Sequence, residues 1–309
     1  MKQALRTYGV QLALIGVAAV WGGTFVVVKD AVSKYPLYAF LALRFGIALV
    51  AFAVVFPSSV RRLTRGTVGV GLLAGLLLTA GYVLQTWGLQ DTTASKAAFI
   101  TGLFVVITPV MQAVVLRLPP RPVTAFGVAL AVVGLWLLSG GSAGGWNVGD
   151  TRVLLCAVAY AAHIIVLGSL GRRHEVLPLT LVQLATVAVL CAAASVVMER
   201  APLPTDASVW LALLLTGVLA SAVAFAVQTY AQRHLSPTRT ALILITEPAF
   251  GGVFGWLAGE RLGIGGVAGA ALILAGMLIA ETVGALRPTT VEEDLEPVIE
   301  GPPVPLIEE

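Results

Sequence analysis

Residues 67–88 read TVGVGLLAGLLLTAGYVLQTWG, and this stretch decides the fold class. It contains no charged side chain, and about 20 apolar residues are enough for a helix to cross the hydrocarbon core of a bilayer. The run from Val70 to Ala80 does not alternate between apolar and polar residues, as the strands of a membrane β-barrel do. The stretch therefore predicts a transmembrane helix.

Further stretches of the same character run along most of the chain. Hydrophobic residues make up 58% and charged residues 11% of its 309 residues, whereas soluble domains carry roughly 25% charged residues. With a mean hydropathy of +0.94, most of the surface must face lipid. The first stretch is too long for a signal peptide and ends without a small-residue cleavage site, so we expect it to be retained. The ten expected spans are 8–28, 37–56, 67–88, 95–116, 122–139, 151–170, 178–198, 208–232, 238–258 and 264–284.

Lysines and arginines are distributed unevenly among the connections between these spans. With a cytoplasmic N-terminus, twelve of them fall on the inside and six on the outside. An excess of Lys and Arg in short loops marks the cytoplasmic side. We therefore expect a multi-pass protein of the cell membrane with both termini in the cytoplasm.

The C-terminal residues 287–309 differ from the rest of the chain. They hold seven acidic residues, one arginine and five prolines, a composition typical of disorder. Without them the chain has 18 basic and nine acidic residues, a net charge of +9. This excess on the cytoplasmic side suits anionic lipid, and it is no evidence for nucleic acid.

The chain repeats itself after 139 to 143 residues. Hydropathy alone would not reproduce prolines and glutamines in the same order. The matched positions are Trp21 with Tyr160, Arg44 with Gln183, Thr108-Pro109 with Glu247-Pro248, Arg121 with Glu260, Gln85-Thr86-Trp87 with Gln228-Thr229-Tyr230, and Gly127 and Gly134 with Gly269 and Gly276. The sequence therefore predicts two homologous halves.

Each half contains five expected spans, and because five is odd the second half must be inverted in the membrane. Inverted repeats are typical of secondary transporters, which bind their substrate near the midplane where the repeats meet. We expect an all-α membrane protein of ten transmembrane helices. It comprises a first repeat over 1–139, a connecting loop over 140–150, a second repeat over 151–286 and a disordered acidic cytoplasmic tail over 287–309.

Several short motifs lie in order along most of the chain. They are Trp21-Gly22-Gly23-Thr24-Phe25, Leu43-Arg44-Phe45, Glu247-Pro248, Gly259-Glu260-Arg261-Leu262 and Leu272-Ile273-Leu274-Ala275-Gly276. Together they resemble the EamA family of the drug/metabolite transporter superfamily over roughly residues 8–284. The resemblance implies a ten-helix, two-repeat, exporter-type carrier of small metabolites, amino acids or drugs. It does not fix the substrate, and His163 departs from the family's pattern.

Glu247 is an acidic residue near the middle of its expected span. A charge at the bilayer centre costs about 2.5–3.5 kcal/mol, so such residues are often functional. Pro248 follows it and removes a backbone donor; we expect Pro109 and Pro248 to kink their helices. Glu247 is a candidate for proton coupling, although a structural carboxyl that binds freed backbone or pairs with Arg44 also fits.

Arg44 and His163 are the other ionisable candidates within the spans. Arg44 either clamps a carboxylate or phosphate of the substrate with its planar fork of donors or ties helices together. His163 follows Tyr160 by three residues and shares its helix face. It serves either as a second proton-coupling group, because histidine titrates near neutrality, or as a helix-to-helix hydrogen bond.

Aromatic and amide side chains complete the expected pathway. Trp21 and Tyr160 are repeat-related and deep in their spans, and buried glutamines need polar partners in a bilayer. The expected substrate-pathway residues are Trp21, Thr24, Arg44, Gln85, Trp87, Tyr160, His163, Gln228, Tyr230 and Glu247.

The leading hypothesis is a secondary transporter that works by alternating access and exports amino acids, related metabolites or drugs. A channel, a lipid-handling protein and a membrane-embedded enzyme are the alternatives. His163, His174 and His234 lie in separate elements without metal-like spacing, so we expect no enzyme activity, cofactor or metal ion. The expected partners are a small-molecule substrate, membrane lipid and protons, with the chain acting as a monomer or homodimer.

Overall fold

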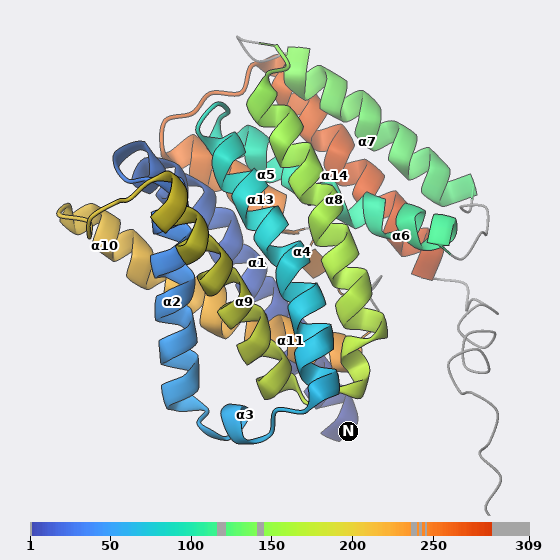
Figure 1. The fold of residues 1–309 in the computed structure, drawn as a ribbon. Helices are drawn as coiled ribbons and strands as arrows, with labels where there is room; N and C mark the ends of the chain where they lie inside the picture. The colour runs from blue at the N-terminus through green and yellow to red at the C-terminus, as the bar shows by residue number, and fades with distance from the viewer. Residues whose placement is uncertain are drawn as a thin grey trace, which may run out of the picture.

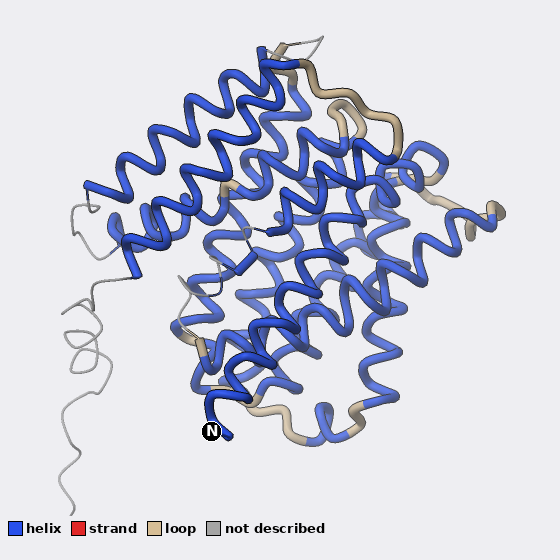
Figure 2. Tube along the Cα trace, turned by 180° about the vertical axis from the view of Figure 1, so that it is seen from behind, coloured by secondary structure: helices blue, strands red, loops and turns tan. Residues whose placement is uncertain are grey.

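The computed structural model describes residues 2–115, 122–140, 145–235, 240, 243–244 and 246–285. Every regular element in these ranges is helical (Figure 2). The expected tail over 287–309 and the centre of the loop over 140–150 lie outside them.

The first half begins with a long helix that crosses the whole bundle (Figure 1). Thr64 and Thr93 cap the starts of α4 and α5 by accepting hydrogen bonds from backbone amides three residues later. The helices of this half are α1 (Lys2–Lys34), α2 (Leu37–Val55), α3 (Ser58–Arg61), α4 (Arg65–Leu89), α5 (Ala94–Gly102), α6 (Phe104–Val115) and α7 (Pro122–Gly140).

The second half follows the same order of long helices. Asn147 and Asp150 form a capping box at the start of α8, so the chain re-enters the bundle at a defined point. The helices are α8 (Val148–Ser169), η1 (Gly171–Arg173), α9 (Val176–Met198), α10 (Ala207–Leu214), the π-helix η2 (Leu215–Val223), α11 (Ala224–His234), α13 (Thr246–Leu257) and α14 (Ile264–Ala285).

Seven helical stretches in the described ranges are long and apolar enough to cross a membrane, and two shorter apolar stretches lie in α7 and α14. Many large apolar side chains are exposed on their outer faces, where lipid replaces water. The prediction of an all-helical membrane protein is confirmed. The first span extends beyond the expected 8–28, because α1 continues to Lys34, whose ammonium pairs with Asp30 at 2.7 Å.

Close contacts between α7 and α14 relate the two halves to each other. A Cβ on Gly134 would lie 2.6 Å from the carbonyl oxygen of Gly269, and one on Gly276 would lie 2.5 Å from that of Gly127. The two contacts are related by the repeat offset of 142 residues. Gly134 corresponds to Gly276, and Gly127 corresponds to Gly269, so each contact joins the counterparts of the other. Residue numbers rise in α7 as they fall in α14, so the helices are antiparallel. Such reciprocal contacts are those of a two-fold axis that exchanges the halves.

A second pair of contacts obeys the same axis at another place in the bundle. A Cβ on Gly75 of α4 would lie 2.5 Å from Cβ of Thr186 in α9. Its repeat-related contact joins Gly217 of η2 to Ile47 of α2, with a distance of 3.1 Å to Cγ2. Small residues allow this close approach, which drives helix packing in a bilayer. Duplicated halves, predicted from the sequence, are confirmed.

Candidate functional site

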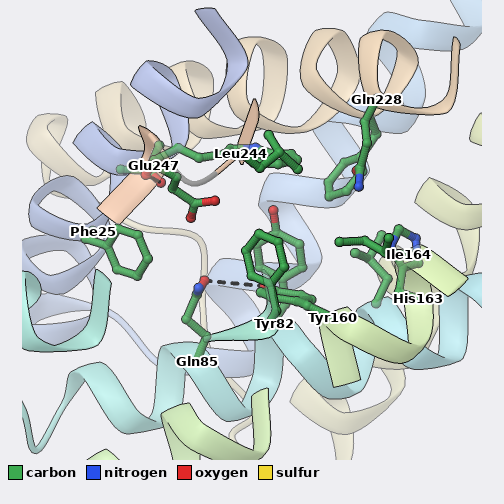
Figure 3. Close-up of a pocket in the computed structure, with 14 residues that line it drawn as sticks. Phe25, Tyr82, Gln85, Tyr160, His163, Ile164, Gln228, Leu244 and Glu247 are labelled. Carbon is green, nitrogen blue, oxygen red and sulfur yellow. Dashed lines mark hydrogen bonds between the residues drawn. The ribbon is translucent and has the colours of Figure 1, made fainter. Parts of the chain in front are cut away.

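A cavity lies inside the bundle where α1, α4, α8, α11 and α13 meet (Figure 3). The space between its lining atoms is about 480 Å³, counted together with the part that is open to solvent. Seven of the ten residues expected along the pathway line it, which are Trp21, Thr24, Gln85, Tyr160, His163, Gln228 and Glu247. The remaining lining residues are Phe25, Leu78, Tyr82, Phe104, Ile164, Phe225 and Leu244.

The lining residues come largely in repeat-related pairs. Ten of the 14 form five pairs, at the same offsets of 139 or 143 residues that relate the halves. The pairs are Trp21 with Tyr160, Thr24 with His163, Phe25 with Ile164, Tyr82 with Phe225, and Gln85 with Gln228. The cavity is therefore built around the two-fold axis, where inverted-repeat transporters place their substrate.

Aromatic rings form much of the wall. Phe225 packs at 5.5 Å from Trp21, 6.1 Å from Tyr82 and 6.2 Å from His163, measured between ring centroids. Tyr82 and Tyr160 meet edge to face at 5.7 Å. These geometries are those of favourable aromatic pairs. They give the cavity a rigid wall with ring surfaces.

Most hydrogen-bond donors of the wall are already engaged. The indole Nε1 of Trp21 donates to the carbonyl oxygen of Ala220 at 2.8 Å, and Thr24 Oγ1 donates to the carbonyl oxygen of Trp21 at 2.6 Å. The Tyr160 hydroxyl faces Oε1 of Gln85 at 3.5 Å. Nε2 of that glutamine lies 3.3 Å from Thr101 Oγ1. These bonds orient the wall from within.

Glu247 reaches the cavity from the first turn of α13 and points toward its centre (Figure 3). The helix sits close to α1, because a Cβ on Gly22 would lie 2.8 Å from the carbonyl oxygen of Glu247. The residue is only 5% exposed. Among the described residues no side chain forms an ion pair or a hydrogen bond with its carboxyl group. A buried carboxyl without a partner strongly disfavours its charged form.

Arg44 lies behind the wall instead of in it. It is 2% exposed, and its guanidinium donates from Nε to Ser221 Oγ at 3.0 Å and from a terminal nitrogen to the Tyr82 hydroxyl at 3.2 Å. The guanidinium carbon also sits 4.6 Å from the centre of the Tyr82 ring. No ion pair joins Arg44 to Glu247 in the described part of the chain. Arg44 therefore acts on the cavity through Tyr82.

The tautomer of His163 follows from its neighbour Gln183. Nε2 of Gln183 donates to the carbonyl oxygen of Leu179 at 3.2 Å, which fixes the orientation of its amide. Oε1 of Gln183 then accepts at 2.8 Å from Nε2 of His163. In the neutral histidine this leaves Nδ1 as an acceptor.

Trp87 and Tyr230 lie away from the cavity. Trp87 is 43% exposed and stacks under the guanidinium of Arg152 at 4.0 Å. The ring of Tyr230 lies 4.5 Å from that of His234, and Tyr230 borders a separate apolar groove between α1 and α11.

The two prolines differ in position. Pro109 lies inside α6, and Pro248 lies two residues after the first described residue of α13, Thr246. The chain leaves regular α-helix at Leu103, between α5 and α6. Gly102 lets Pro248 approach there, since a Cβ would lie 2.7 Å from its Cγ. Kinking at either proline stays a prediction.

At one end of the bundle, three carboxylates of the second half bind groups of the first half. We name this end the carboxylate end, and its residues are Asp150, Glu199 and Glu260. Asp150 pairs with Lys96 at 2.6 Å, with 0% and 4% of the two side chains exposed. Glu199 accepts from the first amides of α2 at 2.9 and 2.7 Å. Glu260 accepts from those of α5 at 2.8 Å each. Charges at helix N-termini are stabilised by the free amides and the dipole.

The opposite end of the bundle has looser links between the halves. Arg62 meets Glu175 at 3.2 Å with both side chains exposed, and Thr67 bonds His174 at 3.1 Å. Exposed pairs of this kind contribute about 0–1 kcal/mol. The carboxylate end was not expected from the sequence, although the capping-box pattern from Asn147 to Asp150 marks part of it.

Both halves match one family of transporters. The model of the EamA-like transporter family matches residues 8–140 and 147–282. The chain belongs to the EamA-like transporter family. This membership makes the chain a multi-pass membrane transporter and not an enzyme, and it agrees with the resemblance found in the sequence motifs.

Several proteins are similar to this EamA-like transporter over most of its length. An uncharacterized transporter of Archaeoglobus fulgidus is 34% identical over 245 residues, which are 79% of this chain and 76% of its own. The uncharacterized transporter YoaV of Bacillus subtilis is 23% identical, covering 87% and 96%. The uncharacterized inner membrane transporter YedA of Escherichia coli is 24% identical, covering 84% and 86%.

A crystal structure of a protein also has the same fold. It superposes with a TM-score of 0.68 at 19% sequence identity, over 94% of this chain and 99% of the other. At this identity the likeness establishes the fold alone.

Proposed function

We propose that this EamA-like transporter exports a small solute by alternating access and couples the movement to protons through Glu247. The observation that supports this most strongly is the carboxyl of Glu247, which has no ion pair or hydrogen bond with any described side chain and lies in a cavity on the two-fold axis. A cavity on such an axis belongs equally to both halves, so the halves can exchange conformations around a fixed solute.

The two ends of the bundle support a cycle with one closed and one open side. Asp150, Glu199 and Glu260 tie the carboxylate end shut across the halves. Their repeat-related positions in the first half are Gln11, Val60 and Arg121, none of which is acidic. The opposite end therefore lacks this set of carboxylates. In the other conformation the contacts of the carboxylate end must break.

Proton coupling requires that protonation favour one of the two conformations. A neutral Glu247 is suited to the largely apolar cavity found here, because a buried charge would cost about 2.5–3.5 kcal/mol. In the other conformation the same carboxyl can ionise against water or a cationic solute. A proton taken up on one side is then released on the other.

The proposed orientation places both termini in the cytoplasm, following the distribution of lysines and arginines. Because α1 runs from the N-terminus to the carboxylate end, that end then faces outward and the structure is closed to the outside. The chain works as a monomer or homodimer in the cell membrane. Cysteines placed at Thr64 and Asp91 test the orientation, since only the second should react with an impermeant maleimide added to intact cells.

Transport in reconstituted vesicles tests the proposed mechanism. A metabolite comparison of cells with and without the protein supplies candidate solutes. With a solute so identified, the protein should exchange labelled for unlabelled molecules and should concentrate the solute when a pH gradient is imposed. Flux without counterflow would indicate a channel, and exchange without any response to the pH gradient would contradict proton coupling.

A further inference from the structure

The described residues that line the cavity include one carboxyl, that of Glu247, and no lysine or arginine, and this restricts what the cavity can bind. We infer that the solute is an amine that is protonated at neutral pH, with an apolar or aromatic body and no carboxylate. The inference rests on the proposed function, because it takes the cavity as the site of transport.

Four donors of the wall have partners within the protein. Trp21 Nε1 is bound to the carbonyl oxygen of Ala220, and Thr24 Oγ1 to that of Trp21. The Tyr160 hydroxyl and Nε2 of Gln85 face acceptors on neighbouring helices. A solute that takes hydrogen bonds from these four groups would have to break the existing bonds.

Two acceptor groups of the wall are free by contrast. In the described part of the chain, the Glu247 carboxyl has no ion pair or hydrogen bond. Nδ1 of His163 is left as an acceptor by the bond that Nε2 makes to Gln183. An ammonium group has three donors and no acceptor, so it matches this set. The amide of Gln228 can also rotate and adapt.

Arg44 lies behind the wall, where its guanidinium does not face a solute in the cavity. Arg44 does not line the cavity, and its guanidinium is held by Ser221 and by the Tyr82 hydroxyl. A carboxylate on the solute would lose its hydration and would face Glu247 with no lysine or arginine among the described lining residues to compensate its charge. The cavity therefore discriminates against amino acids while it accepts the corresponding amines.

Aromatic ring faces of the cavity wall are the other feature that would recognise a protonated amine. Trp21, Tyr82, Tyr160 and Phe225 pack around the cavity at centroid distances between 5.5 and 6.1 Å. Cations bind to the faces of such rings, and the interaction is strongest where water is excluded. The body of the amine packs against the same rings.

A matched pair of probes tests the inference by calorimetry on the full chain in lipid nanodiscs. Phenethylamine and phenylalanine share a benzyl group and an amine, and differ by one carboxylate. Phenethylamine should bind at least about tenfold more tightly, a difference equal to about 1.4 kcal/mol. Equal or tighter binding of phenylalanine would overturn the inference, as would failure of phenethylamine, tyramine and hexylamine alike to bind.

Variants assign the binding to the carboxyl. Glu247→Gln should weaken phenethylamine binding by at least about tenfold, while Glu175→Gln, an exposed carboxylate at the other end, should leave it unchanged. Equal binding of phenethylamine by wild type and Glu247→Gln would overturn the role of Glu247. The comparison of phenethylamine with phenylalanine uses the wild-type protein, so it holds even if a variant does not fold. Amine binding without pH-driven flux would refute the proposed function alone. Conversely, pH-driven flux of a solute that is not an amine would refute only this inference.

Discussion

The two halves of the transporter have the same helices but different chemistry along their shared axis. The first half places Thr24, Tyr82 and Thr108 where the second half has His163, Phe225 and Glu247. The one carboxyl and the one imidazole among the described lining residues thus both belong to the second half. The scaffold is duplicated, which supplies two related conformations, whereas the asymmetric side chains give a proton something to bind. In this account the duplicated helices allow the change between conformations, and the residues that differ between the halves couple that change to protons.

The halves also differ in one helix. In the first half α4 is a continuous α-helix, but its counterpart is interrupted by the π-helix η2. Within η2 the carbonyl oxygen of Ala220 accepts from Trp21, and Ser221 accepts from Arg44. Wider π-helical turns recur at functional sites. Here the π-helix supplies two of the bonds that orient the cavity wall.

The substitution with the largest expected effect weakens the carboxylate end and so makes the two ends of the bundle more alike. Asp150→Asn removes the charge that Lys96 pairs with, and losing one partner of a buried pair costs about 3–5 kcal/mol. This cost falls on the closed conformation, so the carboxylate end should open. A cysteine at Thr24, in a background without Cys156 and Cys191, should then react faster with a maleimide added from that side.

Arg62→Gln is the matched control at the opposite end, because its pair with Glu175 is exposed. It should change the labelling rate little, since exposed pairs contribute about 0–1 kcal/mol. Unchanged labelling in Asp150→Asn would show that the ion pair does not hold this end closed.

The next effect tests the symmetry itself. Gly134→Val and Gly276→Val occupy repeat-related contacts against the backbone of α14 and α7. Each should destabilise the protein by about 1–3 kcal/mol or more, as overpacking does, and the two should do so equally. Thermal unfolding in detergent measures this. Gly46→Ala, which meets nothing within 4 Å, is the control; a large inequality between the two valine variants would argue against the axis.

A substitution with a smaller expected effect on stability makes the two halves identical at one pair of positions. Tyr82→Phe gives position 82 the residue found at its counterpart, Phe225, and removes one acceptor from Arg44. Because the hydrogen bond joins a charged group, its loss should cost about 1.5–3 kcal/mol at most. Unfolding midpoints should fall for Tyr82→Phe, whereas Phe225→Tyr should bring no gain from a new bond to Arg44. A stabilised Tyr82→Phe would contradict the role given to Arg44.

Sequence reasoning located the spans, the halves and half of the residues that line the cavity, for one physical reason. Polar residues in apolar helices are costly, so Glu247, His163 and the two glutamines, Gln85 and Gln228, stand out. Tyr82 and Phe225 were missed, because an aromatic residue in an apolar span looks like packing. Their offset of 143, the same as that of the glutamines, could have found them.

Helix geometry could have excluded Trp87 from the pathway, whereas the carboxylate end depends on tertiary structure and could not be read from the sequence. Trp87 follows Gln85 by two residues, and residues two apart in a helix point to different faces, so it lies outside the cavity. The carboxylate end joins Glu199 and Glu260 to helix starts more than 150 positions away along the chain. No local pattern reports such partners.

Glu247→Gln gives the most direct test of the central claim, that one carboxyl on the two-fold axis couples solute movement to protons. The variant mimics the protonated residue, so at a saturating solute concentration it should keep solute exchange in vesicles but lose accumulation driven by a pH gradient. Normal amounts in the membrane and exchange at saturating solute confirm that it is folded. If Glu247→Gln still accumulates solute with the pH dependence of wild type, Glu247 is structural, the coupling site lies elsewhere, and His163 is the residue to test next.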